Sequence, residues 1–320
     1  MSNFRLLPFS PIRETLYTGS ELLNEFDKDD PGSFTRTLDF QIYKHFVING
    51  SRDVKDPYVS MMQSLHDNSI NQAIDRFKSD RRVIGVMGGH NMARDEKAYI
   101  DIVSLSRRLT RSGFIMCSGG AIGAMEACHL GAALADCSDS FVHDALGMIG
   151  NEEVKTWPKK YDFKQIDPIG NVNQDAIRAI HKWFCPVFSI LESIEKPGQS
   201  LAIPTWHYGF EPPTPFASHI AKYFQNSIRE DGLVAFAKQG VVFAPGSAGT
   251  LQEIFQDAAQ NKYKSFEFFS PMIFFGKKCW ISDYPVGKIL AKLFTKEEFK
   301  ENILFTDSVD KVASFLENWP

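Results

Sequence analysis

The sequence has no excess of positive charge, and this excludes one large class of partners. It contains 35 Lys and Arg against 39 Asp and Glu, a net charge of -4. Proteins that bind duplex DNA or RNA neutralise many phosphates with a basic face, which needs a surplus of cations. We therefore expect no nucleic-acid partner.

Long apolar runs are also missing. No stretch of 18 or more consecutive apolar residues occurs, and the N-terminal MSNFRLLPFSPIRE has two prolines and no continuous apolar core. Neither a membrane span nor a signal peptide has this pattern. We expect a cytoplasmic protein with no membrane partner.

Cysteine is scarce and widely spaced. An odd number of cysteines with no C-x-x-C pair is typical of reduced thiols, so neither a disulfide framework nor a structural zinc site is expected. The five are Cys117, Cys128, Cys137, Cys185 and Cys279.

What the sequence does contain is a regular alternation of apolar strands, glycine turns and amphipathic helices. With 320 residues, 43% of them hydrophobic, the chain can bury a large core. Short apolar runs followed by glycines and then by helical periodicity are typical of a parallel sheet. The sequence predicts an α/β, Rossmann-like, doubly wound and mainly parallel sheet with helices on both faces; strands are expected at 82–87, 114–117, 200–204, 241–243, 271–275 and 302–305.

The alternation is not uniform along the chain. Residues 1–80 lack it and are interpreted as an N-terminal accessory segment, with one helix where apolar residues recur between 61 and 77. The main domain is expected over 81–320, with an insertion around 137–200 in which only NQDAIRAIHKWF has a helical pattern. A helical stretch is also expected from 216 to 238.

The segment VVFAPGSAGTLQEIFQ (241–256) is the strongest motif. An apolar strand enters a turn with Gly246, Ser247 and Gly249, and a helix follows from Thr250. Such a turn directs unpaired N–H groups and a positive helix end at one point, where a phosphate can bind. A second interpretation is structural: Thr250 and Glu253 have the spacing of a capping box.

Two further glycine turns follow strands. SGGAIGAMEA (118–127) places Gly119 and Gly120 after the strand at 114–117, and MGGHN (87–91) places His90 after the first strand. The glycine spacing does not match G-x-G-x-x-G, so NAD is disfavoured. Turns at one edge of a parallel sheet can converge on one crevice, although tight packing would also explain the glycines, and His90 would serve either as a turn residue or as a substrate contact.

Two charged residues near these turns each have two interpretations. Arg229, in NSIREDG, is either a surface arginine paired with Glu230 or Asp231 or a substrate ligand. Glu126 is either a carboxylate favoured by a helix N-terminus or a contact for sugar or base.

Taken together, these motifs resemble the Lonely Guy family of phosphoribohydrolases, long mislabelled as lysine decarboxylases, and within it the larger nucleotide 5′-monophosphate nucleosidases. The resemblance covers roughly residues 81–135 and 200–318. GGAIGAMEACHLGA is similar to the family's first glycine-rich helix start, and PGSAGTLQE to its P-G-G-x-G-T-x-x-E signature. Ser247 stands in place of the usual second glycine, and Glu230 where shorter members have lysine.

The resemblance implies hydrolysis of a nucleoside 5′-monophosphate to free base and ribose 5-phosphate by a protein that is usually dimeric. It implies no pyridoxal phosphate, metal or nicotinamide cofactor, so the expected partners are a nucleotide and a second copy of the chain. Arg229 and Glu253 would be catalytic, with Arg229 fixing the substrate or assisting the leaving base. The 5′-phosphate would lie on Gly246, Ser247, Gly249 and Thr250, with Gly119 and Gly120 on the opposite wall and with His90 and Glu126 as further contacts.

Two other functions are compatible with parts of the sequence. A non-catalytic nucleotide sensor would use the same crevice, but it has no need for a carboxylate against the sugar. A pyridoxal phosphate decarboxylase would need a lysine for a Schiff base, and the glycine turns offer none.

Overall fold

The computed structural model describes residues 6–157, 164–208, 212–265 and 268–319. Residues 158–163, inside the predicted insertion, lie outside these ranges. In the described part the strands form one seven-stranded, all-parallel sheet, in the order β4-β3-β2-β1-β5-β6-β7. The strands are β1 (Val83–Met87), β2 (Ile115–Ser118), β3 (Ser200–Ala202), β4 (His219–Ile220), β5 (Val241–Phe243), β6 (Met272–Phe275) and β7 (Ile303–Thr306). The predicted α/β, doubly wound fold is confirmed.

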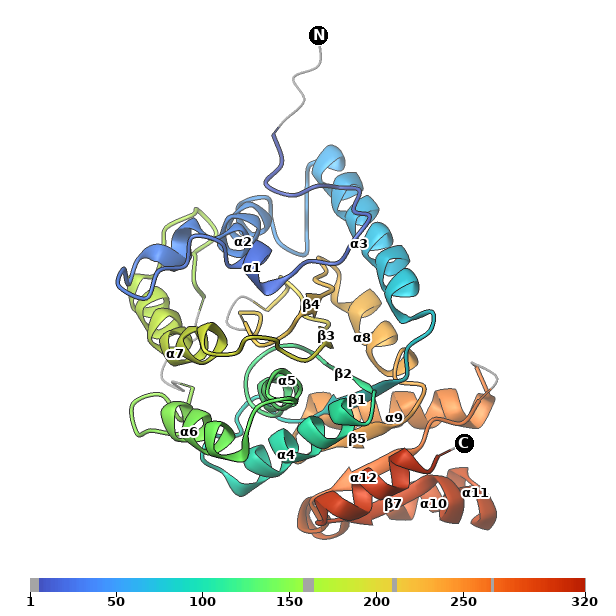
Figure 1. Cartoon of the computed structure of the whole chain (residues 1–320). Coiled ribbons are helices and arrows are strands. Elements are labelled where there is room, and N and C mark those ends of the chain that lie inside the picture. Colours follow the sequence, from blue (N-terminus) through green and yellow to red (C-terminus); the bar gives the residue numbers. More distant parts are fainter. Residues whose placement is uncertain (1–5, 158–163, 209–211, 266–267, 320) are drawn as a thin grey trace.

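Helices cover both faces of this sheet (Figure 1). Several begin at a capping residue, as at Thr37, Asp56 and Asn173, after which apolar residues recur at helical spacing. They are α1 (Gly19–Leu22), η1 (Ser33–Arg36), α2 (Leu38–Ile48), α3 (Pro57–Lys78), α4 (Lys97–Arg111), α5 (Ala124–Ala133), α6 (Asp139–Ile149), α7 (Gln174–Glu192), α8 (Asn226–Ala235), α9 (Ala248–Tyr263), η2 (Lys278–Asp283), α10 (Gly287–Leu293), α11 (Lys296–Asn302) and α12 (Val309–Glu317).

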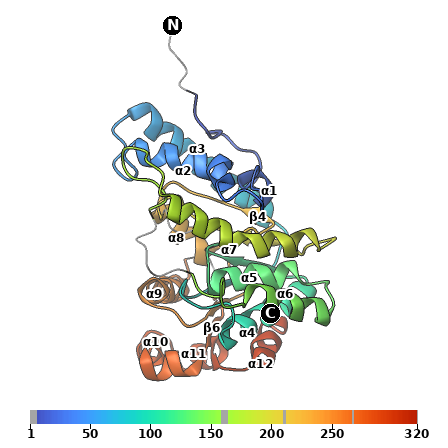
Figure 2. The same ribbon diagram turned by 90° about the vertical axis from the view of Figure 1, so that its left-hand side faces the viewer.

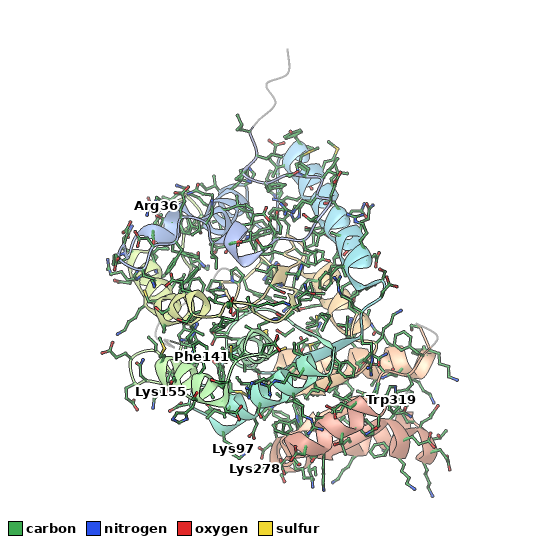
Figure 3. All side chains as sticks on the ribbon, in the orientation of Figure 1. Arg36, Lys97, Phe141, Lys155, Lys278 and Trp319 are labelled. Carbon is green, nitrogen blue, oxygen red and sulfur yellow. The ribbon has the colours of Figure 1, made fainter. Side chains whose placement is uncertain are left out.

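The five inner strands are buried on both faces, where side chains fill the space between the sheet and the helices (Figure 3), and successive side chains enter two different hydrophobic clusters. In β1, Ile84 and Val86 pack with α4, α5 and α12, whereas Val83 and Met87 join the cluster that contains α8 and α9. This follows from the two-residue period of a strand, and it explains why the strand sequences are continuously apolar.

The order of strands reverses beside β1. From β1 the chain proceeds outward through β2, β3 and β4, then returns to place β5, β6 and β7 on the other side. Crevices at such a switch point, at the carboxyl ends of the strands, are the usual ligand sites of open α/β sheets. In this sheet the switch point lies between the neighbouring strands β1 and β5, and the loops that follow these two strands lead away in opposite directions.

The N-terminal segment packs on the β4 end of the sheet (Figures 1 and 2). Tyr17 forms an antiparallel bridge with Ile220 of β4, with N–H···O distances of 3.0 and 2.8 Å in the two directions. The helix predicted at 61–77 is present as α3, which begins where Asp56 caps Tyr58 and Pro57 occupies the first turn. The segment also contains α2, which the sequence did not predict.

Other parts differ from the sequence prediction. The insertion contains α6 as well as the predicted helix, which is extended in α7, and the stretch predicted to be helical over 216–238 is helical only in α8. Within the described ranges, none of these helices is both long and apolar enough to cross a lipid bilayer.

Candidate active site

Three glycine turns meet at the switch point. The Gly89 N–H donates to Pro245 O at 3.0 Å, joining the turns after β1 and β5, and the Ala124 N–H donates to Gly89 O at 3.2 Å, joining the turn after β2. Gly123 has a φ of +72°, and a Cβ there would collide with Gly89 O. The sequence placed these three turns at one sheet edge, and the structure brings them into contact.

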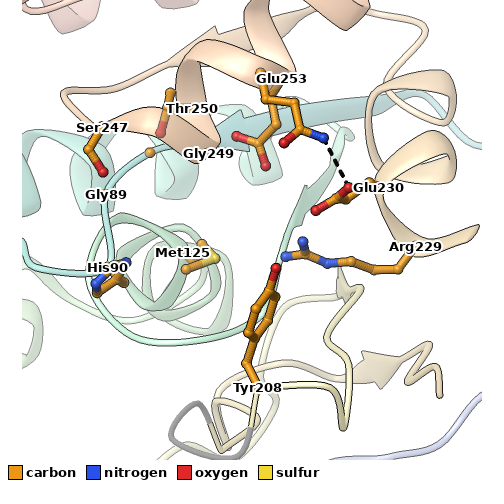
Figure 4. Close-up of a pocket in the computed structure, with 12 residues that line it drawn as sticks. Gly89, His90, Met125, Tyr208, Arg229, Glu230, Ser247, Gly249, Thr250 and Glu253 are labelled. Atoms are coloured by element: carbon orange, nitrogen blue, oxygen red, sulfur yellow. Dashed lines mark hydrogen bonds between the residues drawn. The ribbon is translucent and has the colours of Figure 1, made fainter. Parts of the chain in front are cut away.

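Beside these turns lies a pocket of about 220 Å³. Its walls come from the turns after β1 and β5, from α5, α8 and α9, and from the loop before β4 (Figure 4). The lining residues are Gly88, Gly89, His90, Met125, Tyr208, Arg229, Glu230, Ser247, Gly249, Thr250, Gln252 and Glu253.

The N-terminus of α9 opens on this pocket. The helix begins at Ala248 after Ser247, and no side chain caps it. The Leu251 N–H donates to Ser247 O at 3.0 Å, so the N–H groups of residues 248–250 precede the first turn of helical bonding. A Cβ built on Gly249 would meet no atom within 4 Å. These groups can bind an anion.

The capping-box interpretation of Thr250 and Glu253 is therefore wrong. A capping box needs its Ser or Thr at the N-cap, but Thr250 is the third helical residue. Thr250 instead packs against Gly246, where an added Cβ would collide with the Thr250 side chain and lie 3.1 Å from Gly89 N. Gly246 thus allows the close approach of two turns.

Arg229 reaches the pocket from α8 and is only 8% exposed. Its Nε donates to Ile203 O at 3.0 Å, and its guanidinium points across the pocket toward Tyr208 (Figure 4). Among the described residues, no carboxylate lies within ion-pair distance of it. The interpretation as a surface ion pair is wrong. A buried guanidinium without an acidic partner favours an anionic ligand.

The two acidic neighbours of Arg229 have other partners. Glu230 accepts hydrogen bonds from Asn226 Nδ2 and, at 3.0 Å, from Gln252 Nε2, the bond drawn in Figure 4. Asp231 accepts from Gln256 Nε2 at 3.0 Å. These bonds tie α8 to α9 and leave Arg229 facing the pocket.

Glu253 projects into the same pocket from α9, as Figure 4 shows. The pocket thus contains one guanidinium and two carboxylates, those of Glu253 and Glu230. His90 also lines it. Arg229, Glu253, Ser247, Gly249, Thr250 and His90 are the predicted site residues that the structure brings together; their roles stay predictions.

Glu126 does not reach the pocket, and its predicted contact with substrate is corrected here. It is 1% exposed, and Arg94 binds it through Nε at 2.8 Å and Nη2 at 2.7 Å. Tyr99 Oη donates to it at 2.9 Å and Trp183 Nε1 at 3.1 Å. Both carboxylate oxygens are engaged, so Glu126 holds α4, α5 and α7 together.

Gly119 and Gly120 are not among the lining residues either. A Cβ on Gly119 would lie 2.6 Å from Arg229 Nη2, so this glycine supports the guanidinium from behind. Gly120 has a φ of +71°, and its N–H already donates to Ser118 Oγ at 3.1 Å. The predicted second phosphate wall is absent from the described pocket.

Tyr208 is the main site residue that the sequence did not reveal. Its hydroxyl accepts a hydrogen bond from Asn226 Nδ2 at 3.2 Å, and its ring forms one side of the pocket. It lies in a proline-rich loop without periodicity, so no pattern singled it out. Met125, Glu230 and Gln252 were also not predicted to line the site.

No lysine is among the residues that line the described pocket. Within the described residues, no three His, Cys, Asp or Glu side chains are grouped so that they could hold a metal ion.

Comparison with known proteins finds solved structures that are similar to this chain, but no similar family model or curated sequence. No protein-family model matches the chain, and no curated protein sequence matches it. Among solved structures, a molybdenum cofactor binding protein from the phototrophic bacterium Rippkaea orientalis is 13% identical with a TM-score of 0.44, covering 74% of this chain and 96% of its own. The structural genomics target TM1055 is 15% identical with a TM-score of 0.44, covering 74% and 98%. Neither likeness bears on ligand or activity.

Proposed function

We propose that this protein hydrolyses the N-glycosidic bond of a nucleoside 5′-monophosphate, releasing the free base and ribose 5-phosphate. The observation that carries the proposal is that Arg229, which is buried and has no acidic partner among the described residues, shares one pocket with the Glu253 carboxylate at a helix N-terminus that the Ser247 side chain does not cap. An anion is favoured at the helix end, and a cationic sugar is favoured beside the carboxylate.

In this mechanism the 5′-phosphate accepts hydrogen bonds from the N–H groups at the start of α9, beside Ser247 and Gly249. The ribose then lies along Glu253. As the bond from C1′ to the base breaks, its electron pair leaves with the base and positive charge develops on the sugar ring. Glu253 stabilises that charge and orients a water molecule. The water oxygen bonds to C1′, and the proton that the water gives up ends on the nitrogen of the departing base, so the products are ribose 5-phosphate and the neutral base.

Arg229 completes the arrangement by balancing negative charge. Its guanidinium, fixed by Ile203 O and by Gly119 behind it, either holds the substrate or stabilises the departing base. In the first case it offsets charge that the substrate already carries, and in the second it acts where electron density increases during the reaction.

The test is an assay of the purified protein with AMP, GMP, IMP, CMP and UMP, detecting free base and ribose 5-phosphate together. Glu253→Gln should lower kcat by about 100-fold or more, in the range seen when one group that stabilises a transition state is removed. Glu301→Gln is the matched control, because it makes the same substitution at an exposed position of α11, outside the pocket, and should retain activity.

The sensor alternative gives a different result in the same experiment. If every monophosphate is recovered intact while one of them raises the melting temperature, the protein binds nucleotides without turnover. If neither release nor stabilisation occurs, nucleotide binding at this pocket is disproved.

A further inference from the structure

A second cavity adjoins the candidate active site, and Tyr208 lines both. This cavity measures about 480 Å³, and its other walls come from the loop between α2 and α3, from residues 164–168 and from His207. Figure 4 shows the Tyr208 side chain extending toward the Arg229 guanidinium in the first pocket. Because Tyr208 also lines the second cavity, the two cavities are neighbours.

The pocket at the glycine turns is small and partly open. Its 220 Å³ lies below the range of about 300–1,000 Å³ that is usual for small-molecule sites. A nucleotide whose phosphate lies at the start of α9 would extend beyond this pocket, and the cavity that shares Tyr208 adjoins it.

The N-terminal segment holds this second cavity in place through buried carboxylates. Asp39 of α2 accepts from Trp206 Nε1 at 2.8 Å and from Lys222 Nζ at 2.6 Å. Trp206 directly precedes His207 and Tyr208, so α2 fixes the loop that carries both. The position of the wall thus depends on residues 1–80.

A second anchor acts on the other side. Asp67 of α3 accepts from the main-chain N–H groups of Phe224 at 3.0 Å and Gln225 at 2.9 Å. Gln225 is the N-cap of α8, which carries Arg229. The same N-terminal segment therefore positions the loop of the second cavity and the helix of the first.

The second cavity has the chemistry that a flat heterocycle requires. Tyr43, Val47 and Ile166 supply apolar wall, and Arg52, Asp53 and His207 supply donors and acceptors. Burial lowers the pKa of His207, Arg52 lowers it further, and Glu230 opposes this more than Arg229 adds to it; the net shift favours the neutral ring, which offers one donor and one acceptor. Charged residues of both cavities therefore affect the pKa of His207.

We propose that this second cavity binds the base of the substrate, with the Gly50–Asp53 loop of the N-terminal segment setting which base is accepted. The inference rests on the proposed function for the identity of the substrate. It makes the N-terminal segment part of the active site, and it assigns base selection to residues outside the glycine motifs.

The test compares a ligand that has a base with one that has none. Arg52→Ala and His207→Gln are measured against Arg36→Ala, an arginine of the same segment that is exposed and paired with Asp30 away from both cavities. For the best monophosphate, KM should rise about tenfold in the first two variants, and the order of preference among the five monophosphates should change. The inhibition constant of ribose 5-phosphate should stay the same, as should all values in Arg36→Ala.

Equal weakening of monophosphate and ribose 5-phosphate would overturn the assignment, because the variants would then act on the shared phosphate and sugar. Unchanged monophosphate binding would overturn it as well. Calorimetry that counts two monophosphate molecules per chain would assign the cavity to a separate effector.

The result stays informative if no monophosphate is hydrolysed. The same variants are then compared by calorimetric dissociation constants for monophosphate and ribose 5-phosphate. Absence of turnover contradicts the proposed function alone. The base site is decided separately: a tenfold loss of affinity for the monophosphate, with unchanged affinity for ribose 5-phosphate, supports it, and unchanged affinity for both overturns it.

Discussion

Arg229 Nη2 lies directly against Gly119, so that a Cβ built on this glycine would be 2.6 Å from the nitrogen. The contact joins the turn after β2 to the helix α8 that precedes β5. Arg229 Nε donates to Ile203 O, so a group that filled this space would displace the guanidinium from the position that this bond holds. A glycine in the second motif is thus a support for a side chain from a distant part of the chain.

Gly119→Ala should therefore impair activity more than it impairs folding. The added methyl displaces Arg229 and the flexible Met125, and neither shift strains the backbone, because Gly119 is not among the glycines with positive φ. We expect kcat/KM for the monophosphate to fall about tenfold or more, with a melting temperature close to that of the wild type. Steady-state kinetics and thermal unfolding of the same preparations measure both.

Gly147→Ala is the matched control. Gly147 lies inside α6, and a Cβ there would meet no atom within 4 Å. The substitution should leave kcat/KM unchanged and raise stability by about 0.5–1 kcal/mol, the usual gain of alanine over glycine in a helix. Equal activity of the two alanine variants would contradict the role given to Gly119.

Gly249→Ala tests the phosphate site itself. The position is helical and faces open space, so alanine should fold without strain, but its methyl group would project toward the N–H groups at the start of α9. We expect affinity for ribose 5-phosphate to fall about tenfold, measured by calorimetry. An unchanged affinity would place the phosphate elsewhere.

Much of the fold follows from the sequence because its signal is local. Each parallel strand is buried on both faces and reads as a short apolar run, and six such runs were found, whereas β4, with only His219 and Ile220, has no such pattern. Helix α2 was missed because its polar and apolar residues do not separate cleanly, and the stretch 216–225 was predicted helical although part of it pairs as β4.

The candidate site was predictable only where a motif carries it. Ser247, Thr250 and Glu253 belong to one glycine motif. Because they are close in sequence, the motif alone predicts that they lie close together in the fold. Glu126 was misassigned because its partner Arg94 lies 32 residues away, and no local pattern reveals such an ion pair. Tyr208 was missed for the same reason, since only tertiary packing brings it to the pocket.

His129 predicts how stability depends on pH. It is fully buried, its Nε2 lies 2.8 Å from Ser118 Oγ and its Nδ1 2.9 Å from Ser200 Oγ, and burial lowers its pKa to about 3. The native ring stays neutral while the unfolded ring gains a proton below about pH 6.5. Its contribution to stability is therefore complete above pH 6.5 and declines as the pH falls toward 3, by at most about 1.4 kcal/mol per pH unit.

His129→Gln should be less stable than the wild type at pH 7, by about 1–3 kcal/mol, because one buried serine hydroxyl loses its partner. Between pH 7 and pH 5 its free energy of unfolding should fall less steeply than that of the wild type, since the titrating group is gone. Urea unfolding at the two pH values measures the difference. His143→Gln, at an exposed position of α6, is the control and should reproduce the wild-type slope. Parallel slopes for His129→Gln and the wild type would show that the histidine is not the group that titrates.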